Sequence, residues 1–205
     1  MRAITFRNKV FRSQPFKPKV HCVQTIIGHT SQREELATLA RADRLPSAII
    51  LSGTHGIGKK LIAQELSRLL LCEERESAPI GGCGKCKQCN LYNAGTHPDI
   101  HSLVFSGDRG ANVDDIRIVL EKMSLKAFMG GKKVAIFDDA DEISIVGANV
   151  ILKSLEEPRP DTFFILIVAN PTRLPSTILS RCQRLFFDRL TPDEFRAILK
   201  ARGLP

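Results

Sequence analysis

Long hydrophobic runs are missing from this sequence of 205 residues. No apolar stretch approaches the roughly 18 residues that a membrane-spanning helix needs, so we expect no membrane segment. Six cysteines are too few for a disulfide scaffold, and four of them cluster, which favours a metal site in a reducing cytoplasm. Apolar residues make up 43% of the chain, enough for a substantial core, and the length suits one domain with a short appendage.

The net charge of +8 favours acidic partners such as nucleic acid, but most of this charge is local. Residues 1–20 contain no acid and six basic side chains: Arg2, Arg7, Lys9, Arg12, Lys17 and Lys19. The stretch lacks the apolar segment of a secretory signal. We expect a flexible basic tail, or residues that precede the true start of the protein. The alternative is a phosphate-binding or targeting arm.

Strand-like and helix-like segments alternate along the rest of the chain. Short apolar runs predict strands at 47–52, 100–105, 133–137, 163–168 and 184–187. Helical spacing of apolar residues predicts helices at 32–44, 59–71, 113–128, 143–155 and 192–201. Such alternation is typical of a parallel α/β sheet flanked by helices. In these sheets ligands bind beyond the carboxyl ends of the strands.

Residues 53–60 have the spacing of a phosphate-binding loop, between the first strand and a helix. Its backbone N–H groups would surround phosphates at Gly53, Gly56, Ile57 and Gly58. Lys59 would reach the β and γ phosphates. Seven of the eight positions fit the pattern, so the sequence predicts a P-loop fold.

The eighth position of the loop is Lys60, where a Ser or Thr hydroxyl should bind Mg²⁺. A lysine supplies no oxygen and repels the metal, so we expect impaired hydrolysis, because hydrolysis needs the metal to neutralise charge on the phosphates. Thr54 or water could compensate. Nucleotide binding itself stays open, since Lys59 and the glycines are present.

Two acids, Asp138 and Asp139, follow the apolar strand 133–137. The first matches the carboxylate that orients Mg²⁺ through water. The second stands where a Glu usually polarises the attacking water, and its side chain is one methylene shorter, a misplacement that can be costly. Alternatively, the acids belong to a solvated turn before the next helix.

Four cysteines, Cys72, Cys83, Cys86 and Cys89, predict a structural zinc site. Two overlapping CxxC units suit one tetrahedral ion, and four thiolates leave no position for water. An iron–sulfur cluster and redox thiols are the weaker alternatives. We expect His97 to be a poor substitute ligand, and Cys22 and Cys182 to be core residues.

Together these motifs resemble the AAA+ clamp-loader family, specifically the bacterial DNA polymerase III delta-prime, gamma and tau subunits. The resemblance covers roughly residues 23–200. It rests on the P-loop, on the cysteine module that follows it, and on three stretches: Ile26-Ile-Gly-His29, Ala148-Asn-Val-Ile-Leu-Lys-Ser-Leu-Glu-Glu-Pro158 and Leu174-Pro-Ser-Thr-Ile-Leu-Ser-Arg-Cys182.

The resemblance implies an AAA+ domain at 21–188 with a zinc module inserted at 72–96, followed at 189–205 by the start of a truncated helical lid. It implies that Arg181 reaches a neighbouring subunit's ATP as an arginine finger. Asn170 would lie near the family's sensor 1 position, with the alignment good to one residue. Glu156 and Glu157 would be structural, ending a helix before Pro158.

Lys60 and Asp139 favour the delta-prime type, whose nucleotide sites are often degraded, over gamma or tau. The implied partners are gamma/tau and delta subunits and, through the complex, the sliding clamp and primed DNA. The implied role is a stator of a DNA polymerase holoenzyme with little ATPase of its own. The alternatives are an active ATPase of gamma type, a P-loop nucleotide kinase and a zinc-based nucleic-acid binder. No small-substrate lid or base-stacking platform supports the last two.

Overall fold

The computed structural model describes residues 26–107 and 110–204, so the basic tail at 1–20 and Cys22 lie outside the described residues. The described helices, with 3-10 turns marked η, and strands follow in chain order: α1 Thr30–Arg41, β1 Ala48–Ser52, α2 Lys59–Leu71, α3 Lys87–Asn93, β2 Ile100–Val104, α4 Val113–Ser124, β3 Lys133–Asp138, η1 Ala140–Glu142, α5 Ile145–Glu156, β4 Thr162–Val168, η2 Pro171–Arg173, α6 Ser176–Leu179, β5 Gln183–Phe186 and α7 Pro192–Ala201.

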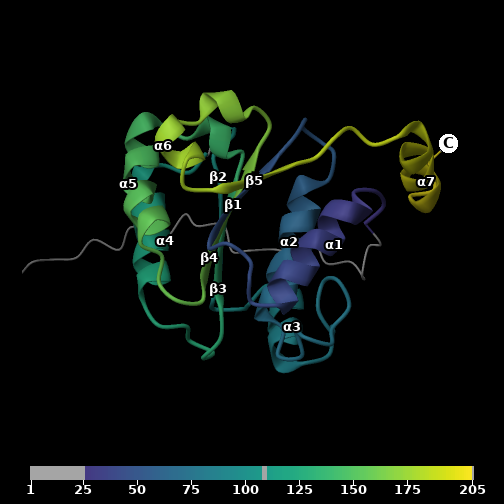
Figure 1. The fold of residues 1–205 in the computed structure, drawn as a ribbon, viewed down its shortest axis with the longest axis horizontal. Coiled ribbons are helices and arrows are strands. Elements are labelled where there is room, and N and C mark those ends of the chain that lie inside the picture. The colour runs from purple at the N-terminus through teal and green to yellow at the C-terminus, as the bar shows by residue number, and fades with distance from the viewer. Residues whose placement is uncertain (1–25, 108–109, 205) are drawn as a thin grey trace, which may run out of the picture.

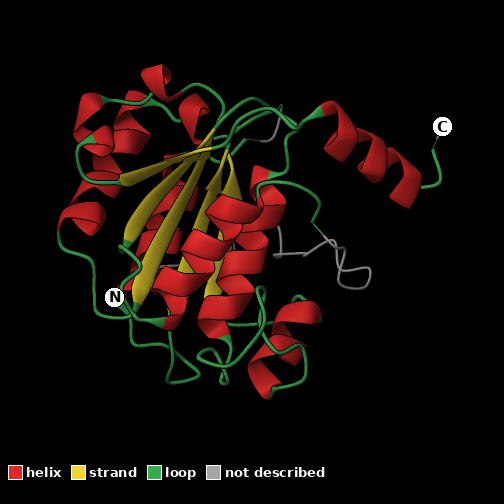
Figure 2. Cartoon of the chain, turned by 45° about the vertical axis from the view of Figure 1, so that its right-hand side comes forward, coloured by secondary structure: helices red, strands yellow, loops and turns green. Residues whose placement is uncertain are grey.

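The five strands form one parallel sheet in the order β2-β3-β4-β1-β5. Helices cover both faces, with α1 and α2 on one side and α4, α5 and α6 on the other (Figures 1 and 2). Each crossover places a helix over the sheet, which explains why the central strands are buried on both faces. The predicted parallel α/β sheet is therefore confirmed.

Alternate residues of the central strands supply two separate cores. In β3, Val134 and Ile136 pack with α1, α2 and the cysteine region, whereas Ala135 and Phe137 pack with α4 and α5. Because successive side chains of a strand point to opposite faces, one apolar run fills both cores. This burial fixes the register of the sheet, and with it the positions of the loops at the carboxyl ends of the strands.

The sequence pattern predicted that helix α4 ends at Phe128, but the helix ends at Ser124. The carboxylate of Asp99, which is buried just before β2, accepts hydrogen bonds from the backbone N–H groups of Phe128 (2.7 Å) and Met129 (2.9 Å). These two amides bond to a side chain rather than to carbonyls of α4. The partner lies about 30 residues away in the sequence, so local periodicity could not reveal it.

Helix α7 lies beside the sheet domain and has no buried residue (Figure 1). Its bounds agree with the prediction. Thr191 and Glu194 form a reciprocal cap at its first turn, which satisfies two backbone N–H groups. No helix in the described part of the chain has the length and apolar character needed to cross a bilayer.

Candidate functional site

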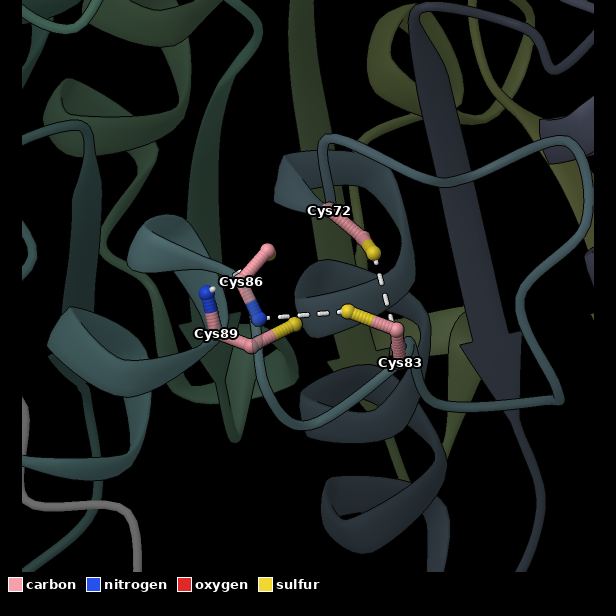
Figure 3. A group of neighbouring side chains, drawn as sticks. All are labelled: Cys72, Cys83, Cys86 and Cys89. Atoms are coloured by element: carbon pink, nitrogen blue, oxygen red, sulfur yellow. Dashed lines mark hydrogen bonds between the residues drawn. The ribbon is translucent and has the colours of Figure 1, made fainter.

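The four clustered cysteines are neighbours in the fold (Figure 3). Their sulfur atoms all lie within 4.8 Å of one another. Tetrahedral zinc with Zn–S bonds of about 2.3 Å needs sulfurs roughly 3.8 Å apart, close to this spacing. Cys72 caps the end of α2 and Cys86 caps the start of α3, so two helix ends position the group. The cluster could therefore hold a metal ion.

Backbone amides support the cysteine sulfurs as acceptors. Cys83 N–H donates to Cys72 Sγ (3.4 Å), Cys86 N–H to Cys83 Sγ (3.3 Å), and Cys89 N–H to Cys86 Sγ (3.4 Å). Donation from the Lys85 backbone lowers the pKa of Cys83 to about 7. Burial raises the pKa of Cys72 and of Cys89. A bound metal ion would favour the thiolate form of all four cysteines against this effect of burial.

Glycine is required at one turn of this knuckle. Gly82 has a φ of +85°, a conformation that L side chains rarely adopt. A Cβ atom there would lie 3.1 Å from Cys89 Sγ and 3.1 Å from the carbonyl oxygen of Arg68. The glycine thus lets the loop approach both α2 and the sulfur cluster.

Hydrogen bonds tie the cysteine module to the sheet domain. The hydroxyl of Tyr92 in α3 donates to the carbonyl of Gln64 in α2 (2.7 Å). His97 Nε2 lies 2.7 Å from Gln88 Oε1, and His97 Nδ1 accepts from Asp99 N–H (3.1 Å). This network assigns the ring proton to Nε2, and burial lowers the pKa of His97. His97 therefore links Gln88 of α3 to the backbone just before β2.

The phosphate-type loop follows β1 and opens α2. Gly56 and Gly58 have positive φ values of 81° and 100°, which favour glycine. At Gly53 a Cβ atom would meet the carbonyl oxygen of Phe187 at 2.3 Å. The backbone around Ile57 thus has the curled form that the motif predicts, at the carboxyl edge of the sheet.

Lys59 is folded back into its own loop. Its side chain is buried, and its Nζ donates to the carbonyl oxygens of Gly53 (2.5 Å) and Thr54 (2.7 Å). Burial lowers the pKa of Lys59, against the attraction of the nearby acids Asp141, Asp138 and Asp139. The ammonium is therefore bonded to loop carbonyls, and a phosphate would have to compete with them.

Lys60 is paired with the first acid after β3. Its Nζ lies 2.7 Å from Asp138 Oδ2, with side-chain exposures of 51% and 11%. A metal held through water at Asp138 would have to share this carboxylate with an ammonium. The lysine supplies no oxygen at the position of a Ser or Thr hydroxyl, and its longer side chain carries the charge past that position to Asp138.

Asp139 adopts the left-handed backbone conformation, with a φ of 52°. Its carboxylate accepts a hydrogen bond from the hydroxyl of Ser106, and its Oδ1 lies 3.7 Å from Nδ1 of His55. His55 belongs to the phosphate-type loop. The second acid thus faces the loop but is also bound to a neighbouring strand end, which restrains its reach.

Asp141 is a residue of this edge that the sequence did not single out. Its buried carboxylate accepts from the backbone N–H groups of Ala169 (3.2 Å) and Asn170 (3.1 Å), just after β4. The side chain of Asn170 is itself engaged, since its Oδ1 accepts from Thr172 N–H (3.1 Å) and Thr172 Oγ1 (2.7 Å). The structure thus brings the loop, both predicted acids and Asn170 to one edge of the sheet.

Arg181 lies after α6 and does not contact these residues in the described structure. Its Nη2 forms an ion pair with Glu156 Oε1 (2.6 Å), and its Nη1 donates to Thr177 O (3.0 Å) and Ser180 Oγ (3.1 Å). Glu156, taken from the sequence as part of a helix stop, is therefore also the partner of Arg181. Cys182 beside it is buried, as predicted, and burial raises its pKa to about 11.

Residues 28–191 match the protein family described as "DNA polymerase III, delta subunit". This chain belongs to that family. The match covers the phosphate-type loop at 53–60, the acids after β3 and the cysteine module between them. It confirms the resemblance inferred from the sequence, with delta' proteins as relatives and gamma/tau proteins next.

The curated relatives described next share 31–41% of the aligned residues with this chain. The DNA polymerase III subunit delta' of Pseudomonas aeruginosa is 41% identical over 66% of this chain and 41% of its own length. That of Escherichia coli is 37% identical over 79% of this chain and 48% of its own length. The Bacillus subtilis subunit tau is 31% identical over 89% of this chain and 31% of its own length. The chain thus spans less than half the length of these relatives.

Solved structures agree in fold. A DNA polymerase III gamma subunit-related protein of Thermotoga maritima superposes with a TM-score of 0.56 at 24% identity, over 81% of this chain and 49% of its own. The RuvB Holliday junction branch migration motor of the same organism gives 0.54 at 19% identity, over 91% and 53%. At these identities the likeness concerns the fold alone, and it confirms the P-loop AAA+ class with its parallel sheet.

Proposed function

We propose that this chain is a delta-prime-like subunit of the DNA polymerase III clamp loader that hydrolyses little ATP itself. Its partners are gamma/tau and delta subunits and, through the complex, the sliding clamp and primed DNA. Membership of the delta subunit family supports the complex. The observation that carries the inert site is the ion pair of 2.7 Å between Lys60 and Asp138. An ammonium then neutralises the carboxylate that hydrolysis needs for Mg²⁺.

The domains are proposed as the sequence divides them. Residues 21–188 form the AAA+ unit and 189–205 the start of the lid, with α7 as its helix. The four cysteines bind one structural zinc ion, because four thiolates close the coordination sphere and leave no site for water. Zinc thus holds the segment between α2 and β2, and takes no part in chemistry.

Arg181 is proposed to act on ATP bound by a neighbouring subunit. A guanidinium carries its charge at all physiological pH values and can bond two phosphate oxygens at once. Its position in the Ser180-Arg181-Cys182 stretch, shared in pattern with the clamp-loader family, supports this role. Arg181 would then offset charge that develops on the transferred phosphate.

ATP turnover tests the proposed function. The pure chain should show negligible turnover in Mg²⁺. A complex reconstituted with full-length subunit should hydrolyse ATP, and Arg181→Ala should lower the rate. The decrease should be smaller than the rate factor of ~10³–10⁵ that arginine fingers give in GTPases, because only one of several sites depends on Arg181. Arg184→Ala, which removes an exposed arginine of β5, is the matched control. An unaffected Arg181→Ala complex contradicts the trans role.

The second candidate is an ATP-hydrolysing subunit of gamma/tau type. The similarity to Bacillus subtilis tau, which extends over 89% of this chain, favours it. The glycines and Lys59 of the loop are compatible with both candidates, because they also maintain the fold. Turnover of several per second by the pure chain would select this candidate, since it lies in the ordinary range of enzymes.

A further inference from the structure

The guanidinium of Arg181 is engaged with groups of its own chain. It has three oxygen partners: Glu156 Oε1 at 2.6 Å, Thr177 O at 3.0 Å and Ser180 Oγ at 3.1 Å. Bonds to Thr177, four residues earlier, require the side chain to fold back over the end of α6. An arginine that serves another subunit has to point its N–H groups away from its own domain. In the observed conformation Nη1 and Nη2 of Arg181 instead point at groups of its own domain.

The surroundings that hold Arg181 are electronegative. Thr177 belongs to the last turn of α6, where helix carbonyls lack partners within the helix, and Glu156 is the last residue of α5. The C-terminal end of α5, a helix of 12 residues, carries partial negative charge, and the single turn of α6 adds the carbonyl oxygen of Thr177. A cation is stabilised here without any ligand from outside.

Glu156 occupies an unfavourable position in its own helix. A carboxylate at a helix C-terminus opposes the helix dipole, and the last turn of α5 contains one compensating base, Lys153. The ion pair with Arg181 offsets this cost. Glu157, the next residue, is also an exposed acid, but no ion pair of Glu157 is found in the described part of the chain. The two neighbouring glutamates therefore differ in their relation to Arg181.

We propose that Glu156 is a latch that holds Arg181 in a parked conformation until a nucleotide phosphate of the neighbouring subunit displaces it. This inference rests on the proposed trans role of Arg181. The side chains of Arg181 and Glu156 are 36% and 44% exposed, and pairs of this exposure change an equilibrium by about fivefold at most. The latch is weak enough to open, since a phosphate accepts two N–H groups of the fork and carries more charge.

The test compares Glu156→Gln with its neighbour Glu157→Gln in the reconstituted complex of full-length subunits. The substitution at 156 removes the charge and keeps the shape, so Arg181 loses its ion pair and is held less strongly. We expect Glu156→Gln to raise ATP hydrolysis by the complex at limiting ATP by up to about twofold, because only one of several sites depends on Arg181, and Glu157→Gln to leave it unchanged. The double variant Glu156→Gln/Arg181→Ala should match Arg181→Ala alone, because the latch acts only through the arginine. Zinc content and thermal midpoint of each variant check folding.

The outcomes separate the latch from the proposed function. If Arg181→Ala slows the complex but Glu156→Gln equals wild type, the latch is wrong and the trans role stands. If Glu156→Gln slows the complex and Glu156→Asp restores it, Glu156 positions the arginine for use, and parking is again wrong. If Arg181→Ala has no effect, the trans role is wrong and the latch falls with it.

Discussion

Replacing Lys60 by threonine tests most directly the proposal that this lysine makes the nucleotide site inert. Threonine restores the hydroxyl that binds Mg²⁺ in P-loop proteins and frees Asp138 from its ion pair of 2.7 Å. We expect the variant to gain nucleotide affinity that depends on Mg²⁺, whereas the wild type should bind nucleotide, if it binds at all, equally with and without the metal.

The expected size follows from electrostatics. If Lys60 kept its position, a Mg²⁺ ion held through water at Asp138 would lie roughly 4 Å from the ammonium. The repulsion between charges of +1 and +2 at this distance is about 8 kcal/mol at an effective dielectric constant of 20 and about 2 kcal/mol in bulk water. Because the lysine is half exposed, it can swing away and avoid most of this cost. A gain of at least about tenfold in affinity, equivalent to about 1.4 kcal/mol, is the conservative expectation.

The assay measures the affinity of the pure chain for a fluorescent ATP analogue, in Mg²⁺ and in EDTA. Lys60→Ala removes the ammonium without adding a ligand, so it separates relief of repulsion from metal ligation. Lys126→Thr removes the same charge from an exposed loop position and should change nothing. Stability should fall by less than about 1 kcal/mol, because the lost ion pair is partly exposed. Equal binding of Lys60→Thr in Mg²⁺ and in EDTA would refute the argument that Lys60 blocks the metal.

Two further predictions concern the cysteine module and the acid limit of stability. The freshly reduced protein should contain about one zinc per chain. Cys86→Ser should lose the zinc and expose residues 72–96 to protease, whereas Cys182→Ser should keep it, because that buried thiol lies outside the cluster. Wild-type protein without zinc would contradict the site. Burial, with the charges of Lys122 and Lys133, lowers the pKa of His101 to about 4, below the unfolded value of about 6.5, so the unfolded chain takes up the proton first. Stability from a neutral His101 is therefore present above pH ~6.5 and is lost towards pH 4, by at most about 3 kcal/mol. His101→Asn should flatten this loss in urea unfolding at pH 7 and 4.5, measured against wild type, and parallel pH curves would refute it.

The sequence predicted the sheet well because its strands are short apolar runs that only a doubly covered parallel sheet can bury. It also placed α2 and α7 at their observed bounds. It missed α3 within the cysteine stretch, a helix of seven residues capped by Cys86 Sγ, since glycines and cysteines hide so short a pattern. Boundaries also shifted where distant side chains bind the backbone, as Asp99 does after α4.

The candidate site was predictable as a set of residue types but not as a set of contacts. Spacing identified the four cysteines, because metal ligands in a knuckle are close in sequence. The pairing of Lys60 with Asp138 and of Arg181 with Glu156 joins residues from different elements, and only the folded sheet brings them together. Asp141 was missed for the same reason, since its two amide partners follow β4.

A phosphate-type loop can persist in a protein that no longer uses ATP, because several of its residues also maintain the fold. At Gly53 any side chain would collide with the backbone of Phe187, next to β5. Lys59 is buried and bonds to two carbonyls of the loop, so its loss would leave those acceptors without their donor. These residues therefore distinguish poorly between an active and an inert site. The half-exposed Lys60 contributes to the fold only through one ion pair. The residue type at position 60 is therefore more informative about catalysis than the residue types at 53 and 59.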